Sequence, residues 1–148
     1  MFFLKELPTA AMLEGYAARY PDMEAETVSA ALTRLRWASL TIRALEAYFA
    51  EHGLSQTQFL ILMAIDREPE RESLLPSEIA DRLDISRPIV TNAITRLERT
   101  GLVAWEPQGA DRRRKPLRLS AAGRERLDAL LPGYFRLIHE RMAASRGQ

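Results

Sequence analysis

Side chains able to bind a nucleic acid gather in residues 86–96, which have helical spacing. An apolar stripe runs along one side of this stretch, and the residues that point away from it include two arginines and no acidic residue: Ser86, Arg87, Pro88, Thr91, Asn92, Thr95 and Arg96. Threonine, asparagine and arginine can hydrogen-bond to phosphates and base edges, and a major groove is wide enough to admit a helix. The pattern predicts a DNA-reading helix, and the alternative is a solvated polar face.

A second basic stretch lies between two short strand-like segments, residues 102–105 and 117–119. It contains four cations and one anion, in the order Asp111, Arg112, Arg113, Arg114 and Lys115. A strand, a basic tip and a returning strand form a β-wing, and an arginine at such a tip can enter the negative minor groove. We expect Asp111 to orient an arginine, with Arg113 as its partner, through a bidentate pair. The alternative is a solubilising loop.

The elements that position these residues form a helix-turn-helix. Pro76 is tolerated in the first turn of a short helix, residues 76–83, and Asp84 and Ile85 form a tight turn. Ser86 is the expected N-cap of the second helix, which ends at Gly101. An earlier helix is expected to begin with a capping box at residues 55–58 and to end near residue 67. Residues 69–73, between that helix and the helix-turn-helix, are expected to form a charged loop.

A longer helix is expected over residues 24–52, preceded by a short arm at residues 9–20. Its apolar residues form a heptad-like seam: Val28, Ala31, Leu35, Ala38, Ile42, Leu45 and Phe49. A second apolar group lies roughly opposite: Trp37, Leu40, Ala44 and Tyr48. Such a helix either is a core helix of one subunit or turns its second face to another subunit or a ligand. The last helix, residues 120–142, contains Pro132 and Gly133, which are expected to kink or interrupt it.

Composition excludes several other classes of protein. The 148 residues are 47% hydrophobic and 28% charged with a net charge of +1, so one globular domain is expected and any affinity for a polyanion must be local. Cysteine is absent and there are two histidines, so we expect no disulfide, metal or cofactor. Because the longest apolar run spans only residues 59–65 and no leader is evident, a cytoplasmic protein is expected, without membrane association.

Taken together, these blocks resemble the MarR family of winged helix-turn-helix regulators. The resemblance covers residues 53–124 closely and rests on the order and spacing of six segments: LSQTQF (54–59), SEIADRL (77–83), SRPIVT (86–91), RLERTGLV (96–103), DRR (111–113) and LSAAG (119–123). It implies a mainly α fold with a small β-wing (α+β) in a single domain, residues 1–148. Residues 54–120 would form the DNA-binding lobe, and residues 1–52 and 121–148 would form the dimerisation helices.

The resemblance further implies a homodimer that binds double-stranded DNA at a pseudo-palindromic operator, and a repressor released by a small-molecule effector. The family's pocket tends to lie between the dimerisation helices and the lobe, where the candidates are Arg36, Trp37, Tyr48 and His52. Each also has a structural explanation, because large aromatic side chains on helices usually pack and a histidine at a helix C-terminus is favoured by the dipole.

Some positions depart from the family pattern. Asn92 and Thr95 stand where many members carry arginine and aspartate, Trp105 and Glu106 where basic residues are common, and Leu75 in place of a polar cap. The operator sequence therefore cannot be transferred. Two other hypotheses remain: a winged helix used only for protein association, and an enzyme. The sequence has no glycine-rich phosphate loop or nucleophile elbow that would support an enzyme.

Overall fold

The computed structural model describes residues 6–107 and 115–146. The chain divides into two compact units. Met1–Leu45 with Ile138–Gln148 form the arm unit, and Glu46–Leu137 form the lobe. Two long helices contribute to both units: α2 (Ala25–Glu51) begins in the arm unit, and α6 (Ala121–Arg146) begins in the lobe. Within the described ranges, no helix is long and apolar enough to cross a membrane.

The arm unit buries little of its apolar surface. It contains α1 (Ala10–Ala17), which begins where the Thr9 hydroxyl accepts a hydrogen bond from the Met12 N–H at 3.3 Å. Trp37 Nε1 donates to the carbonyl oxygen of Arg141 at 3.1 Å and so ties α2 to the end of α6. Of its described residues, only Leu13 and Thr41 are buried. Its large apolar side chains are exposed at seven positions: Met12, Tyr16, Tyr20, Leu35, Leu40, Ile42 and Met142.

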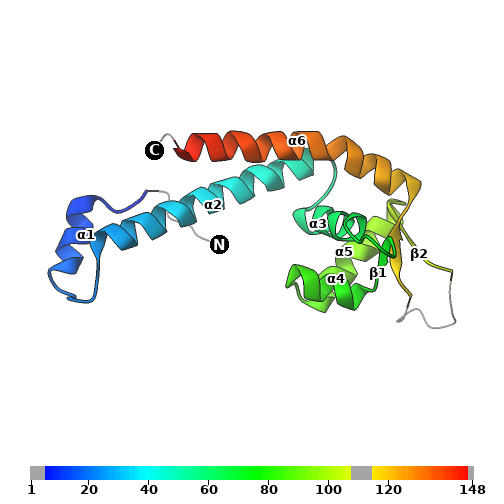
Figure 1. The fold of residues 1–148 in the computed structure, drawn as a ribbon, viewed down its shortest axis with the longest axis horizontal. Helices are drawn as coiled ribbons and strands as arrows, with labels where there is room; N and C mark the ends of the chain where they lie inside the picture. Colours follow the sequence, from blue (N-terminus) through cyan, green and yellow to red (C-terminus); the bar gives the residue numbers. More distant parts are fainter. Residues whose placement is uncertain (1–5, 108–114, 147–148) are drawn as a thin grey trace. The chain divides into compact units, whose positions relative to one another are not determined.

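The lobe has a continuous core built around three short helices. α3 (Gln56–Asp66), α4 (Pro76–Leu83) and α5 (Arg87–Arg99) all contact one another, and α3 and α5 lie against a small sheet (Figure 1). The predicted capping box is confirmed: the Ser55 hydroxyl accepts from the Gln58 N–H at 3.2 Å, and the Gln58 side chain accepts from the Ser55 N–H at 2.7 Å. Apolar side chains of α3 form the centre of the core: Phe59, Ile61, Leu62, Ala64 and Ile65.

The sheet has three antiparallel strands in the order β1-β3-β2. β2 (Val103–Trp105) and β3 (Leu117–Leu119) are the predicted wing strands, and β1 (Ser73–Leu74) is the third. Ala104 and Ser73 both lie opposite Arg118 in the register. The prediction that Ser73 belongs to a loop was therefore wrong. A strand of two residues has no detectable periodicity, and it forms here because its backbone pairs with β3.

The last helix continues through Pro132 and Gly133, so the predicted interruption does not occur. Proline removes one backbone N–H, but tertiary contacts hold the helix on both sides of it. Leu127 and Leu130 are buried before it. After it, the ring of Tyr134 packs 4.8 Å from that of Phe59 between centroids.

Candidate nucleic-acid interface

A tight turn joins the two helices of the predicted helix-turn-helix. The Leu75 N–H at the start of α4 donates to the Glu78 carboxylate at 2.8 Å, while Leu75 itself supplies no side-chain cap. Asp84 adopts the left-handed region with φ of 51°, and the Ile85 N–H donates to the Ala80 carbonyl at 3.1 Å. Three residues therefore separate the two helices, and the first of them, Asp84, has a conformation that aspartate tolerates.

Ser86 occupies the N-cap position of α5, as predicted, but its hydroxyl makes no capping hydrogen bond. Pro88 follows in the first turn, which contains no acidic residue. The first backbone N–H groups of a helix have no partner within the helix and carry partial positive charge. The start of α5 thus presents uncapped donors, an arrangement that suits a phosphate.

α5 has one buried face and one exposed face. The predicted apolar stripe of Val90, Ala93, Ile94 and Leu97 is buried. On the other side, the candidate DNA-binding side chains are all exposed, and with them Arg99: Ser86, Arg87, Pro88, Thr91, Asn92, Thr95 and Arg96. Burial of the stripe fixes the rotation of α5, so this polar face must point away from the core.

The exposed face keeps its cations available. Within the described part of the chain, no ion pair involves Arg87, Arg96 or Arg99. The hydroxyls of Thr91 and Thr95 donate to carbonyl oxygens one turn earlier, each at 2.9 Å. These hydroxyls can still accept a hydrogen bond from a base amino group, but they must rotate to donate to a phosphate.

Two exposed residues were not singled out from the sequence. Ile89 is 50% exposed beside the polar face of α5, where an apolar side chain can contact a thymine methyl group. Arg118 is exposed on β3 between buried Leu117 and Leu119. A signal existed for each, because Ile89 lies off the apolar stripe and Arg118 alternates with apolar neighbours.

The base of the wing is attached to α5 by the Trp105 side chain. Its Nε1 donates to Glu98 Oε1 at 3.0 Å. The Glu106 N–H donates to the Pro116 carbonyl at 3.0 Å and extends the pairing of the strands. Lys115 is half-buried just before β3, whereas the wing-tip residues lie outside the described residues: Asp111, Arg112, Arg113 and Arg114.

Four charged residues join α4 to the segment that contains β1. Glu68 is buried and forms an ion pair with Arg82, and its other oxygen lies 3.9 Å from Arg71 Nε. Arg71 Nη2 lies 2.9 Å from Glu78 Oε1. The hydrogen bond from Leu75, and then the contact with Arg71, hold the pKa of Glu78 below its ordinary value although burial opposes this.

The beginning of α6 packs against the end of α5. Gly101 has φ of 72° and closes α5 in the left-handed conformation that glycine adopts easily. Ser120 donates its hydroxyl to the Gly101 carbonyl and its N–H to the Leu102 carbonyl, the latter at 3.1 Å. A side chain at Gly123 would collide with the Leu102 carbonyl. The LSAAG segment is therefore a packing feature that places β2 and α5.

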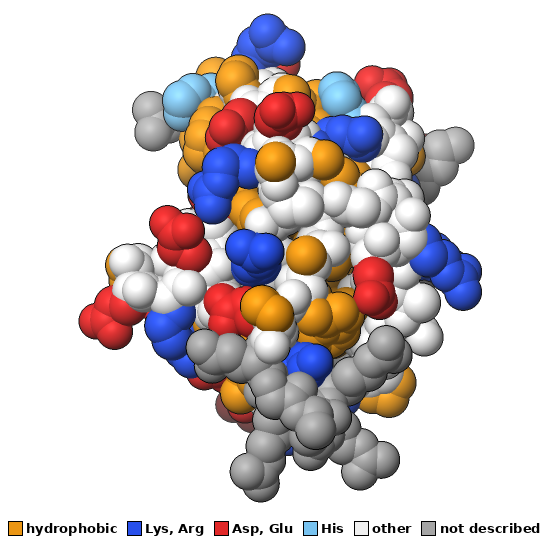
Figure 2. All heavy atoms as spheres, turned by 90° about the vertical axis from the view of Figure 1, so that its right-hand side faces the viewer, with side chains coloured by type: hydrophobic (Ala, Val, Ile, Leu, Met, Phe, Trp, Pro, Cys, Tyr) orange, Lys and Arg blue, Asp and Glu red, His pale blue; other side chains and the backbone are white. Residues whose placement is uncertain are grey.

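The charged side chains on the wing side of the protein do not form a single basic patch. Seen from the wing side, lysine and arginine side chains are interspersed with acidic ones over the described surface (Figure 2). This agrees with the net charge of +1. Affinity for a polyanion would have to come from local contacts, as the sequence indicated.

The four candidate pocket residues fall into two groups. Arg36 and Trp37 line a pocket of the arm unit. Tyr48 and His52 belong to the lobe, where Tyr48 Oη donates to the Leu130 carbonyl at 2.8 Å and His52 Nδ1 lies 2.8 Å from the Tyr48 carbonyl oxygen. No described pocket is lined by all four.

Comparison with known proteins places the chain among transcription regulators. A model of the MarR family matches residues 52–114. The HTH-type transcriptional repressor YetL of Bacillus subtilis is 31% identical over 136 residues, which cover 91% of this chain and 80% of that protein. The chain belongs to the MarR family. It is therefore a winged-helix DNA-binding transcriptional regulator and not an enzyme.

Solved structures agree with this fold. AbsC, a MarR family regulator from Streptomyces coelicolor, matches with a TM-score of 0.67 at 20% identity, over 95% of this chain and 84% of that one. The Mycobacterium tuberculosis MarR family protein Rv2887, in complex with DNA, matches with a TM-score of 0.63 at 20% identity, over 74% and 79% of the two chains. The mainly helical fold with a small antiparallel sheet, predicted for this MarR-family chain, is confirmed.

Proposed function

We propose that this MarR-family protein is a homodimeric repressor that binds a pseudo-palindromic operator and is released by a small molecule. The exposed face of α5 carries the proposal, because its guanidinium groups are not engaged in ion pairs within the described residues and the α5 N-terminus is uncapped. In this reading, Arg87 and Arg96 contact phosphates, Asn92 reads a base, and the wing enters the minor groove.

The wing contacts rest on sequence alone. The proposed contacts are Arg112, Arg113, Arg114 and Lys115, with Asp111 as the residue that orients Arg113. A repressor is the proposed outcome because YetL is named as one. The other possibility, a winged helix that only associates with proteins, does not require a free basic face on α5.

Direct binding measurements test the DNA contacts. Fluorescence anisotropy with a duplex from the promoter beside the coding sequence gives the affinity at several salt concentrations. Arg96→Ala and Arg113→Ala should each weaken binding to all sequences and lower the salt slope by about one unit. Asn92→Ala should relax preference at one base position by roughly 1–3 kcal/mol. Arg136→Ala, which removes an exposed arginine of α6, is the matched control and should change neither.

The outcomes separate the two candidate functions. If salt-dependent affinity for duplex DNA is lost with the α5 and wing arginines but not with Arg136, the DNA-reading function is supported. Unchanged affinity and salt slope in both arginine variants would contradict the docking arrangement and favour a protein-association module.

The apolar face of α2 supports the homodimer. Leu35 is 49% exposed and Ile42, seven residues later in the same seam, is 42% exposed. A heptad-spaced exposed seam is typical of a helix that packs against another helix. Ile42→Glu should convert the protein to monomers in sedimentation and lower operator affinity, because two half-sites are then no longer linked. Ser29→Glu adds the same charge on the other side of α2 and should leave the dimer intact.

A further inference from the structure

Glu68 is the only charged residue that is buried in the described part of the chain. It lies between α3 and β1, where it forms an ion pair with Arg82 and has its other oxygen 3.9 Å from Arg71 Nε. A glutamate is almost never buried unless it is paired, because an uncompensated charge away from water costs free energy. Glu68 therefore depends on these two arginines, and neither of them belongs to the exposed face of α5.

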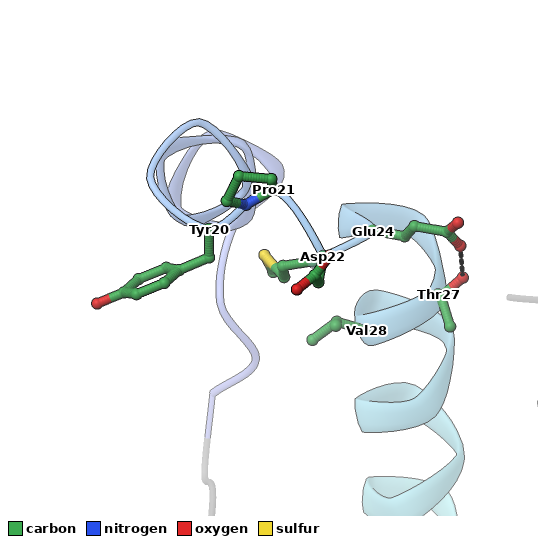
Figure 3. A pocket seen from close by; sticks show the side chains of 7 residues that line it. Tyr20, Pro21, Asp22, Glu24, Thr27 and Val28 are labelled. Carbon is green, nitrogen blue, oxygen red and sulfur yellow. Dashed lines mark hydrogen bonds between the residues drawn. The ribbon is translucent and has the colours of Figure 1, made fainter.

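Other acidic side chains make contacts of a more local kind. Beside a surface pocket of the arm unit, Glu24 accepts a hydrogen bond at 2.8 Å from the hydroxyl of Thr27, one turn further along the chain (Figure 3). Both residues are exposed, so this contact acts only on the start of α2. Glu68, in contrast, is buried and reaches a partner in a different element.

The two arginines connect Glu68 to both ends of α4. Arg82 lies in the last turn of α4. Arg71 Nη2 lies 2.9 Å from Oε1 of Glu78, which belongs to the first turn. The four side chains thus form a series of alternating charge, in the order Glu78, Arg71, Glu68 and Arg82. Through this series, the segment before β1 holds α4 at two points along its length.

α4 has little apolar anchoring of its own. It contains eight residues, and those that are buried are Ile79 and Ala80. Three residues separate it from α5, and the two helices are in contact, so a tilt of α4 changes the position of the start of α5. In a helix-turn-helix, the residues near the N-terminus of the second helix contact the base edges. The orientation of α4 therefore affects which bases α5 can reach.

Stability alone does not account for a buried ion pair. Apolar residues of similar volume often give equal or greater stability, because the attraction between the charges only offsets their desolvation. We propose that Glu68 is a positioning residue for DNA binding: through Arg82 and Arg71 it holds α4, and with it the start of α5, in the orientation that reads the operator. This inference rests on the proposed function for its DNA-binding consequence, whereas the effect of Glu68 on α4 does not.

Removal of the Glu68 charge gives a test in which the sign of the effect is informative. Glu68→Gln keeps the size of the side chain and makes the protein more positive, so electrostatic attraction alone would strengthen its binding to DNA. The positioning role instead predicts that affinity for the promoter duplex falls by about fivefold or more, as measured by fluorescence anisotropy. Unchanged or tighter binding would overturn the proposal.

Glu70→Gln is the matched control. It makes the same change of charge in the same segment, at an exposed residue that takes part in no ion pair among the described residues. Its affinity for the promoter duplex should be unchanged or slightly higher. A loss equal to that of Glu68→Gln would show that the burial and pairing of Glu68 are not what matters, and would contradict the proposal.

A scrambled duplex of the same length separates orientation from loss of folded protein. A smaller folded fraction lowers the affinity for both duplexes by the same factor. A misplaced α5 loses base contacts but keeps non-specific phosphate contacts, so Glu68→Gln should lower the ratio of promoter to scrambled affinity. An unchanged ratio with both affinities reduced would assign the effect to stability and contradict the positioning role.

A double variant keeps the test decisive if Glu68→Gln folds poorly. Glu68→Met combined with Arg82→Met removes the ion pair without changing the net charge. Its melting temperature should stay within a few degrees of that of the unsubstituted protein, because apolar residues can replace a buried pair. The ratio of promoter to scrambled affinity should nevertheless fall. An unchanged ratio in this variant would overturn the proposal.

Hydrogen exchange on the free protein distinguishes failure of this inference from failure of the proposed function. In Glu68→Gln, amides of α4 and of the turn before α5 should exchange faster than in the unsubstituted protein, whereas those of α3 should not change. Equal exchange in α4 would show that Glu68 does not hold this helix. If the unsubstituted protein binds neither duplex, the proposed function fails, and exchange still decides whether Glu68 holds α4.

Discussion

The lobe completes its own core, whereas the arm unit does not. All but one of the buried apolar residues belong to the lobe, and Leu13 is the exception in the described arm unit. Conversely, most of the exposed large apolar side chains belong to the arm unit, including Leu35 and Ile42 on α2. A unit that exposes apolar side chains at heptad spacing gains stability when another surface covers them. The comparison shows that the lobe has a core of its own, whereas the described arm unit leaves most of its large apolar side chains uncovered.

The largest expected difference between the two units is in the cost of truncating an apolar side chain. Phe59→Ala in the lobe should destabilise the fold by about 3–5 kcal/mol, because its ring is fully buried. Leu35→Ala should change the stability of the monomer by less than about 0.5 kcal/mol. Urea unfolding at low protein concentration measures both. Equal losses would show that the arm unit has a core of its own.

Glycine substitutions sharpen the same contrast. Gly123→Ala places a methyl group against the Leu102 carbonyl and should cost roughly 1–3 kcal/mol, because backbone must shift. Gly15 lies inside α1 with no atom within 4 Å of an added Cβ, so Gly15→Ala should be neutral or stabilise by up to about 1 kcal/mol. Thermal melts with operator-binding assays test both. A destabilising Gly15→Ala would mean that α1 packs more tightly than described.

Acid should weaken the lobe through the charged residues around α4. The folded-state pKa of Glu78 lies below its unfolded value of about 4.5, so its stabilisation is present above that value and is lost as pH falls through the folded pKa. Glu78→Gln should lower stability by about 1 kcal/mol at pH 7, with the loss shrinking towards pH 3. Unfolding at both pH values tests this. A loss independent of pH would assign the effect to packing.

The smallest effect is expected at the base of the wing. Trp105→Phe keeps the aromatic surface but removes the N–H that donates to Glu98 at 3.0 Å. Since this pair is exposed, stability should fall by about 0.5 kcal/mol or less. If the hydrogen bond orients the wing, the substitution should reduce the free energy of operator binding by more than it reduces the free energy of unfolding. Glu98→Gln retains an acceptor and is the matched control.

Sequence patterns were most informative where a local rule was strong. Pro76, Ser55 with Gln58, and Gly101 marked helix ends because caps and positive φ depend on neighbouring residues. The buried stripe of α5 followed from helical period alone. Strand β1 was missed because pairing with β3, a distant segment, creates it. Pro132 was expected to kink or interrupt α6, and the interruption does not occur, since packing of Leu127, Leu130 and Tyr134 outweighs local propensity.

For the candidate site, too, sequence patterns predicted some features and only the fold showed others. Spacing identified the polar face of α5, but only the fold showed that Ser86 leaves its helix end uncapped and that Ile89 is exposed beside that face. The resemblance to the MarR family grouped Arg36 and Trp37 with Tyr48 and His52 as candidate pocket residues. Arg36 and Trp37 line a pocket of the arm unit together with Arg141, a residue over a hundred positions away from Trp37 in the chain.

The sequence by itself determined the family, the helix-turn-helix and the residues that face away from its core, because each follows from period, caps and block order. Only the tertiary structure decided which donors are satisfied, that Trp105 joins the base of the wing to α5, and that Arg141 has a buried N–H without a partner among the described residues. The physical reason is that hydrogen-bond partners and burial depend on segments far apart in the chain, whereas helical period and capping depend on residues a few positions away.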